Sequence, residues 1–251
     1  MRCSTVEAAV ALMAVPLFIA AASGAAGGWE PAHATFYGHP DPNESQKGAC
    51  AYDNVFTQGY GTMTTALSTV LFNGGATCGA CYEIRCSNSP WCLPGSVTVT
   101  GTNLCPPSNK PSNNGGWCNP PLRHFDLNKP AFLKIGQFKA GIVPVEFRRV
   151  TCVKSGGIKF EMKGHKFWIA VLVYNVGGAG DLRAVAVKGT RTGWIAMKRN
   201  WGAQWLVEGQ PSLVGQALSF LVTAGDGRTV QSDEVAPASW QFGRTYEGKQ
   251  F

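Results

Sequence analysis

Eight of the nine cysteines in this 251-residue chain lie between residues 50 and 152, and none lies after them. The eight are Cys50, Cys78, Cys81, Cys86, Cys92, Cys105, Cys118 and Cys152. An even number of cysteines in a secreted chain predicts a framework of four disulfides. This framework must stabilise residues 50–152 in a way that the last hundred residues do not share.

Secretion is predicted by the N-terminal segment, which contains the ninth cysteine, Cys3. Arg2 is followed by an almost wholly apolar run over residues 8–22 and then by small residues up to Ala26. This order is typical of a cleaved signal peptide, so residues 1–26 are interpreted as one. A retained anchor is the alternative, but roughly 15 apolar residues are short for a membrane span. We therefore predict an extracellular protein without an integral membrane span.

The uneven cysteine distribution predicts two domains, over residues 27–154 and 155–251, joined at Lys154-Ser-Gly-Gly157. The first domain has short strand-like runs, and helices are expected over 64–72 and after Asn128, a good N-cap with Pro130 in the first turn. This pattern predicts a small β-barrel with peripheral helices. The second domain has evenly spaced strand candidates and no cysteine, which favours an immunoglobulin-like β-sandwich. The strand candidates are 34–37, 81–86, 97–102 and 143–150, then 158–162, 167–176, 182–188, 193–198, 205–208, 218–223 and 229–235.

Composition and charge exclude several classes of function. Apolar residues make up 45% of the chain and charged residues 15%, which is the balance of a folded protein. The net charge of +7 is spread out rather than gathered in a Lys/Arg stripe, so nucleic acid is not an expected partner. A basic surface suits weak, salt-sensitive attraction to an acidic matrix such as pectin, although ordinary solubility charge explains it equally well.

The spacing of the cysteines also allows a second interpretation, a zinc site. Cys78-Gly-Ala-Cys81, followed by Cys86 and Cys92, has the spacing of zinc ligands. An oxidising compartment favours disulfides over thiolates, so we predict no metal site and no cofactor. Cys86 is near enough to Cys92 to close a small loop, as Cys105 is to Cys118, but spacing does not fix the full connectivity.

Carboxylates decide whether such a chain could cut a glycosidic bond, because glycosidases use a pair of them. Asp126, between apolar residues in His124-Phe-Asp-Leu127, is the best candidate for a proton donor, since burial would raise its pKa. A local hydrogen bond or ion pair is the alternative role for Asp126. A second carboxylate is harder to find. Gly38 follows Thr35-Phe-Tyr37, and Asn103 has an amide. The remaining acids, Asp41, Glu44 and Asp53, stand in turn-like stretches.

Tryptophans in the second domain suggest a surface on which sugar rings could stack. Trp194 is expected in a strand and in the core, and Trp201-Gly202 is expected in an exposed loop. Trp168, at a strand start, fits either location. A row of exposed rings would form an apolar patch, and binding is the usual reason for such a patch.

Taken together, these motifs resemble the α-expansins of plant cell walls from about Trp29 to Phe251. The motifs are Ala34-Thr-Phe-Tyr-Gly38, Gly48-Ala-Cys50, Gln58-Gly-Tyr-Gly-Thr62, Cys78-Gly-Ala-Cys81, Gly116-Trp-Cys-Asn-Pro120, His124-Phe-Asp-Leu127, Arg148-Arg-Val150, Asn175-Val-Gly-Gly-Ala-Gly-Asp181, Arg191-Thr-Gly-Trp194 and Asn200-Trp-Gly202. Two positions depart from the family pattern. Ala51-Tyr-Asp53 stands where Gly-Tyr-Gly is usual, and Asn128 replaces a serine while keeping N-cap chemistry. Asn43-Glu-Ser45 is a glycosylation sequon, so its loop is expected at the surface.

The resemblance implies a six-stranded double-ψ β-barrel similar to family-45 endoglucanases, followed by a cellulose-binding sandwich. It implies that Asp126 matches the endoglucanase catalytic acid, that Thr35, Tyr37 and His124 line the same groove, and that Gly38 stands near the position of the missing base. It places Trp168 and Trp201 at the family's cellulose-binding aromatics. The implied disulfides are Cys50–Cys78, Cys81–Cys152, Cys86–Cys92 and Cys105–Cys118.

The function implied is loosening of the plant cell wall without hydrolysis. The protein, expected to be a monomer, would disrupt contacts between cellulose and xyloglucan-type glucans, and this loosening is expected to be favoured at acid pH. Acidic pectin is a further candidate partner. Two alternatives stay open. One is a weak endo-β-glucanase that uses Asp126 with another acid, and the other is a passive cellulose-binding wall protein.

Overall fold

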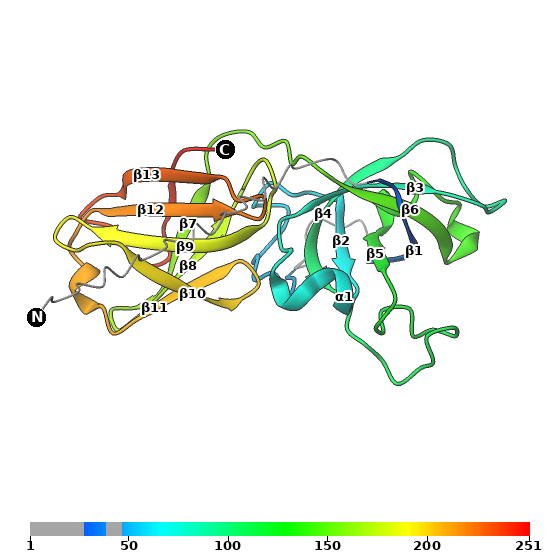
Figure 1. Ribbon diagram of the computed structural model, residues 1–251, viewed down its shortest axis with the longest axis horizontal. Coiled ribbons are helices and arrows are strands. Elements are labelled where there is room, and N and C mark those ends of the chain that lie inside the picture. Colours follow the sequence, from blue (N-terminus) through cyan, green and yellow to red (C-terminus); the bar gives the residue numbers. More distant parts are fainter. Residues whose placement is uncertain (1–27, 39–46) are drawn as a thin grey trace, which may run out of the picture.

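The computed structural model describes residues 28–38 and 47–251, which form two β-rich halves lying side by side in an elongated molecule (Figure 1). The predicted signal peptide and the Asn43 sequon fall outside these residues. In the part described, no helix has both the length and the apolar character needed to cross a membrane.

The first half is a closed barrel with the strand order β1-β5-β2-β4-β3-β6. Two of its strand pairs, β1 with β5 and β2 with β4, run parallel, and the others run antiparallel. Phe125, Leu127 and Ile84 are fully buried in its core. The strands are β1 (Glu30–Tyr37), β2 (Thr64–Leu67), β3 (Cys81–Cys86), β4 (Val97–Leu104), β5 (His124–Asn128) and β6 (Val143–Val150).

The helix expected over residues 64–72 is wrong for its first half. Residues Thr64–Leu67 form β2, and only Thr69–Phe72 form helix α1, followed by the 3-10 turn η1 (Asn73–Gly75). All four residues of β2 are buried, because this short strand is hydrogen-bonded on both sides, to β4 and β5. Barrel closure therefore overrides the helical pattern. Helix α2 (Lys129–Phe132) follows Asn128 as expected, and η2 (Phe138–Ala140) precedes β6.

The second half is a β-sandwich made from one continuous sheet with the order β13-β12-β9-β10-β11-β8-β7-β14. Strand β10 pairs with β9 through its first residues and with β11 through its last, so the sheet folds over at β10. Phe160 of β7 stacks on Phe220 of β12 at 4.3 Å between ring centroids, which joins the two layers across the core. The strands are β7 (Lys159–His165), β8 (Trp168–Tyr174), β9 (Leu182–Gly189), β10 (Ile195–Trp201), β11 (Gln204–Glu208), β12 (Leu218–Ala224), β13 (Thr229–Ala236) and β14 (Thr245–Glu247), with the 3-10 turn η3 (Pro211–Leu213).

The two halves are packed together by apolar, ionic and backbone contacts. Leu172 and Tyr174 of β8 join the hydrophobic cluster of the barrel. Lys163 of β7 pairs with Asp53 at 2.5 Å. Gly202 lies so close to the barrel that a Cβ there would approach the backbone of Cys50 to 2.5 Å, so only glycine fits. These contacts hold the two halves against each other over a shared boundary. The boundary between Lys154 and Ser155 stays a prediction, and it falls between the end of β6 and the start of β7.

Among the residues that the structure describes, four disulfides are present, and all of them lie within residues 50–152. They are Cys50–Cys78, Cys81–Cys152, Cys86–Cys92 and Cys105–Cys118, the same pairs that the family resemblance implied. Because Cys78, Cys81, Cys86 and Cys92 are all oxidised, the zinc reading of their spacing is wrong. Cys152 also forms a β-bridge with Gly178, so its disulfide anchors the start of the connection between the halves.

Removing these disulfides should lower stability by unequal amounts. Loop-closure entropy predicts a loss of about 4 kcal/mol in the free energy of unfolding for Cys81→Ala with Cys152→Ala, which opens a sequence separation of 71 residues. The matched pair Cys86→Ala with Cys92→Ala opens a separation of only 6 residues and should cost about 2 kcal/mol. Urea unfolding of both double variants measures the difference. Equal losses would show that the loop entropy is not what these bonds contribute.

Candidate functional site

The parallel pairing of β1 with β5 brings the predicted barrel residues together. The register places His33 beside His124, Thr35 beside Asp126, and Tyr37 beside Asn128. Side chains alternate between the two faces of a strand, and Ala34, Phe125 and Leu127 occupy the barrel core. The polar residues of both strands therefore share the opposite face. Two segments about 90 residues apart in the sequence thus build one cluster.

Thr35 connects two of the predicted site residues. Its hydroxyl donates a hydrogen bond to Oδ1 of Asp126 at 2.7 Å, and its Oγ1 lies 2.8 Å from Nε2 of His124. When the Asp126 carboxylate is ionised it can only accept, so the Thr35 hydroxyl proton points toward it and Nε2–H of His124 donates to Thr35. The result is a relay of hydrogen bonds from His124 through Thr35 to Asp126.

The burial of this cluster shifts the acidities of its members. Burial raises the pKa of the Asp126 carboxyl above its usual value, and the hydrogen bond from Thr35 partly opposes the rise. Burial, with a smaller effect of the neighbouring His33, lowers the pKa of His124 to about 4. At mildly acid pH His124 is therefore largely neutral, while Asp126 keeps its proton to a higher pH than an exposed carboxyl does.

Tyr37 completes the cluster as a hydrogen-bonding group rather than as a base. Burial, with a smaller effect of the Asp126 carboxylate, raises the pKa of Tyr37 to about 12, although the Thr64 hydroxyl partly opposes the rise. The phenol thus stays protonated across the pH range of living tissue. Thr64 of β2, which lies 1% exposed, was not expected from the sequence, because its place beside Tyr37 depends on barrel closure.

Of the three acids considered as a partner for Asp126, one is described by the structure. Asp53 is 58% exposed at its side chain and forms an ion pair with Lys163 in the other half, so it serves the contact between the halves. Asp41 and Glu44 fall outside the described residues. Asn103 accepts hydrogen bonds from the backbone N–H groups of Ala49 and Leu104, and so holds the loop that precedes Cys50.

The structure corrects the expectation that the side chain of Asn128 caps the helix that follows it. It occupies the N-cap position of α2 but makes no side-chain cap hydrogen bond. Its side chain is fully buried instead, on the face that bears Asp126, and neither amide atom has a partner among the described residues. Strand pairing to Tyr37 fixes this orientation, which explains why capping chemistry did not predict it.

Trp168 and Trp201 lie on one face of the sandwich, as a comparison of strand register and burial shows. Ile169, Val171 and Val173 of β8 point into the core, so Trp168 and Leu172 point away from it. Leu172 pairs with Gln204, and Gln204 pairs with Trp201 after a β-bulge in β10. Directly paired residues share a face, so Trp168 and Trp201 share the outer face of the sandwich, which packs against the barrel at Leu172.

This aromatic face differs in part from the sequence expectation. Trp201 is 49% exposed but ends a strand rather than standing in a loop, and its ring lies 6.1 Å from that of Phe72 in α1. Phe167, which is 56% exposed beside Trp168, was not singled out, although an aromatic next to that tryptophan is a visible signal. Trp194 was expected in the core, but it precedes β10, is 38% exposed and packs against Lys188.

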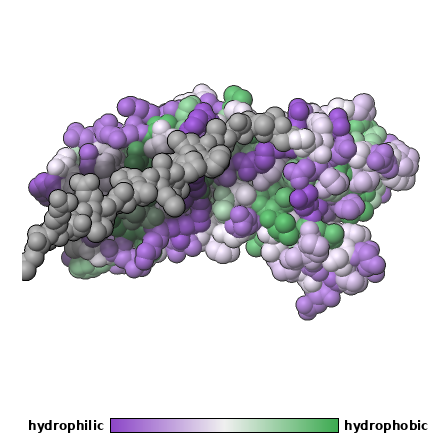
Figure 2. Space-filling view, viewed as in Figure 1, coloured by the Kyte–Doolittle hydropathy of each residue, from purple (hydrophilic) through white to green (hydrophobic). Residues whose placement is uncertain are grey.

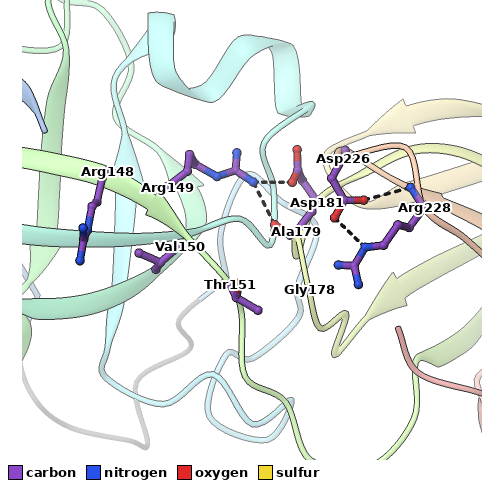
Figure 3. Close-up of a pocket in the computed structure, with 10 residues that line it drawn as sticks. Arg148, Arg149, Val150, Thr151, Gly178, Ala179, Asp181, Asp226 and Arg228 are labelled. Atoms are coloured by element: carbon purple, nitrogen blue, oxygen red, sulfur yellow. Dashed lines mark hydrogen bonds and ion pairs between the residues drawn. The ribbon is translucent and has the colours of Figure 1, made fainter. Parts of the chain in front are cut away.

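A cavity of about 570 Å³ lies at the junction of the halves, away from the Asp126 cluster. Figure 3 shows Arg149 reaching Asp181, with Asp226 and Arg228 paired beside them. Arg148, which also lines the cavity, pairs with Glu83, and hydrogen bonds from the Ser96 hydroxyl and from Arg148 lower the pKa of that carboxyl. Because each arginine has an acidic partner, this group is a network of ion pairs between strands and turns.

Replacing Thr35 should move the acidity of Asp126 in a defined direction. Thr35→Val removes the hydrogen bond that stabilises the carboxylate, so the pKa of Asp126 should rise further above its usual value. Thr35→Ser keeps the hydroxyl and should leave the pKa nearly unchanged. Carbon NMR of the Asp126 carboxyl during a pH titration measures both. A pKa that falls in the valine variant would contradict the hydrogen bond's direction.

Two family models match the chain. The model described as "Expansin C-terminal domain" matches residues 158–237, and the model described as "Lytic transglycolase" matches residues 64–147. Expansin-A23 of Arabidopsis thaliana is 54% identical over 222 residues, covering 88% of this chain and 80% of the relative. Expansin-A25 of Oryza sativa subsp. japonica is 52% identical over 239 residues, covering 92% and 93%.

Solved structures agree with the arrangement of both halves. An apo expansin of Clavibacter michiganensis superimposes with a TM-score of 0.68 at 21% identity, covering 88% of this chain and 97% of that one. A mutant of the same expansin in complex with cellohexaose superimposes with a TM-score of 0.66 at 20% identity, with the same coverage. At this identity the likeness shows a shared fold.

Proposed function

The chain belongs to the plant expansin A family, and on that premise we propose that it loosens plant cell walls without cutting their polysaccharides. It separates glucan chains by competing for the contacts between them. The barrel cluster of Thr35, Tyr37, His124 and Asp126 holds one stretch of glucan. The outer aromatic face with Trp168 and Trp201 holds cellulose. Wall tension then lets the freed chains slip.

The observation that carries this proposal is the half-buried Asp126, which accepts a hydrogen bond from Thr35 and lies beside a neutral histidine. Because its pKa is raised, Asp126 stays protonated to a higher pH than an exposed carboxyl does, and in that form its O–H can donate to a sugar oxygen. A hydrolase also needs a second group to activate water or attack the sugar. His124, with its pKa lowered to about 4, is a hydrogen-bond donor to Thr35, and Tyr37 with a pKa of about 12 stays protonated. Asp53 is engaged with Lys163.

The acid pH preference follows from the same group. As pH rises through the raised pKa of Asp126, the acid loses the proton that it donates, and the ionised carboxylate can only accept hydrogen bonds. Loosening should therefore decline over that range. Thr35→Val, which raises the pKa further, should extend loosening to higher pH, whereas Thr35→Ser should not.

Secretion and the choice of partners complete the proposal. The N-terminal segment directs the chain out of the cell to the wall, and the partners are cellulose and xyloglucan-type glucans. The net charge of +7 adds weak attraction to acidic pectin, which salt should remove. A related expansin fold in complex with cellohexaose supports the choice of a β-glucan ligand.

Creep of a clamped, heat-killed wall strip tests the proposal directly. The mature protein should extend the strip at acid pH while reducing ends in the same bath stay at the level of the buffer control. Release of reducing ends in proportion to extension would favour the endo-β-glucanase instead. Binding to cellulose without any extension of the strip would favour the second alternative, a passive cellulose-binding protein.

A further inference from the structure

A second cavity opens on the outer face of β1, next to the Asp126 cluster. Its volume is about 520 Å³, within the range of pockets that hold small ligands. Residues from β1, β6, α1 and two loops line this cavity, which we name the His33 pocket: Pro31, Ala32, His33, Val70, Ser87, Asn88, Pro121, Leu122, Arg123, Pro144, Val145 and Glu146.

His33 links this pocket to the cluster around Asp126. It stands two residues before Thr35 on the same face of β1, which places their Cα atoms about 7 Å apart. It pairs with His124 in the strand register, and its proximity contributes to the low pKa of that residue. The pocket therefore continues along β1 from the site that holds Asp126.

The charge of the pocket favours a neutral ligand. Arg123 is paired with Glu30 at 2.8 Å, and Glu146 is paired with Arg85 at 2.8 Å. Both charged side chains in the lining are thus compensated, so neither an anion nor a cation gains a free partner. The lining therefore favours a neutral sugar over an acidic one, in spite of the basic net charge of the chain.

The remaining lining suits a sugar ring. Proline, valine and leucine side chains offer apolar surface to the C–H faces, and Ser87, Asn88 and His33 offer hydrogen bonds to hydroxyls. The ring of Trp117 lies 6.3 Å from that of His33 and adds an aromatic neighbour. His33 is exposed, so its ring is available to a ligand.

We propose that the His33 pocket is an additional subsite for a neutral β-glucan, holding the sugars that extend along β1 from Asp126. This rests on the proposed function, because it assumes that a glucan lies against Asp126. The affinity of the barrel for a glucan should then depend on the number of sugars in the glucan. A long oligosaccharide fills both places, and a short one fills only one.

Filling the pocket tests the subsite. Ser87→Tyr places a ring where the sugar would lie, and the backbone N–H of Ser87 remains bonded to Pro144. Val70→Tyr, at a residue that is 43% exposed on α1, fills it from another side. Val214→Tyr, at a residue that is 42% exposed in the second half and does not line the pocket, is the matched control that leaves it open. Affinity for cellohexaose should fall about tenfold in Ser87→Tyr and in Val70→Tyr, which corresponds to the loss of one or two hydrogen bonds, and should be unchanged in Val214→Tyr.

Imidazole NMR resonances locate the bound sugar. The resonance of His33, assigned with a His33→Gln variant, should shift on adding cellohexaose to the mature protein, and Ser87→Tyr should abolish the shift. A shift at His124 with none at His33 would overturn the subsite and leave the proposed function intact. If a saturating concentration of cellohexaose shifted neither resonance, both the subsite and the proposed function would be contradicted. Near-UV circular dichroism shows whether each tyrosine variant is folded. If one of Ser87→Tyr and Val70→Tyr fails to fold, the other tests whether the pocket binds sugar.

Discussion

Asp126→Asn should reduce wall creep about tenfold at acid pH and abolish its dependence on pH. A carboxylic acid is a stronger donor than an amide, and the loss of one well-placed hydrogen bond to a sugar has roughly this effect. The amide does not titrate, so what activity remains should be flat where the wild type declines. Creep at several pH values measures both effects.

Two further variants make this prediction specific. Asp126→Ala removes donor and acceptor together and should fall below the asparagine variant. Asp233→Asn, an exposed carboxylate on β13, neutralises a charge far from the cluster and should behave as the wild type. Full activity of Asp126→Asn at every pH would remove this residue from the mechanism.

Trp201→Ala should weaken binding of the protein to cellulose by about 2 kcal/mol, or roughly thirtyfold, and Trp168→Ala should weaken it to a similar extent. Large aromatic side chains dominate the energetics of flat binding surfaces because each one covers a large area with little loss of conformational freedom. The two rings share the outer face of the sandwich, so a single polysaccharide surface can contact both.

Trp194→Ala is the matched control for this second prediction. Trp194 is 38% exposed, similar in type to Trp201, but it stands at the opposite end of β10. Depletion of protein from solution by microcrystalline cellulose gives the affinities, and thermal unfolding checks the contact between Trp201 and Phe72. Equal losses in all three variants would mean that exposed apolar surface, rather than the outer face, governs binding.

The family resemblance pointed to the residues of the site, but the sequence did not give their geometry. Thr35 and Asp126 were each singled out, yet the bond between them requires β1 and β5 to pair in parallel in one register. Asn128 had a recognised capping pattern, and the strand nonetheless turned its side chain inward. Propensity describes a few neighbouring residues, whereas a strand register depends on a partner far along the chain.

The sequence by itself determined which parts of this protein are cross-linked and which are not. Cysteine placement and the two-residue alternation of apolar side chains are local properties, so a disulfide-bonded barrel and a cysteine-free sandwich could both be anticipated. Tertiary structure alone decided that Asp53 reaches Lys163 and that a bulge in β10 turns Trp201 outward. A single extra residue in a strand reverses the face of everything after it, and only the pairing of whole strands selects where that residue falls.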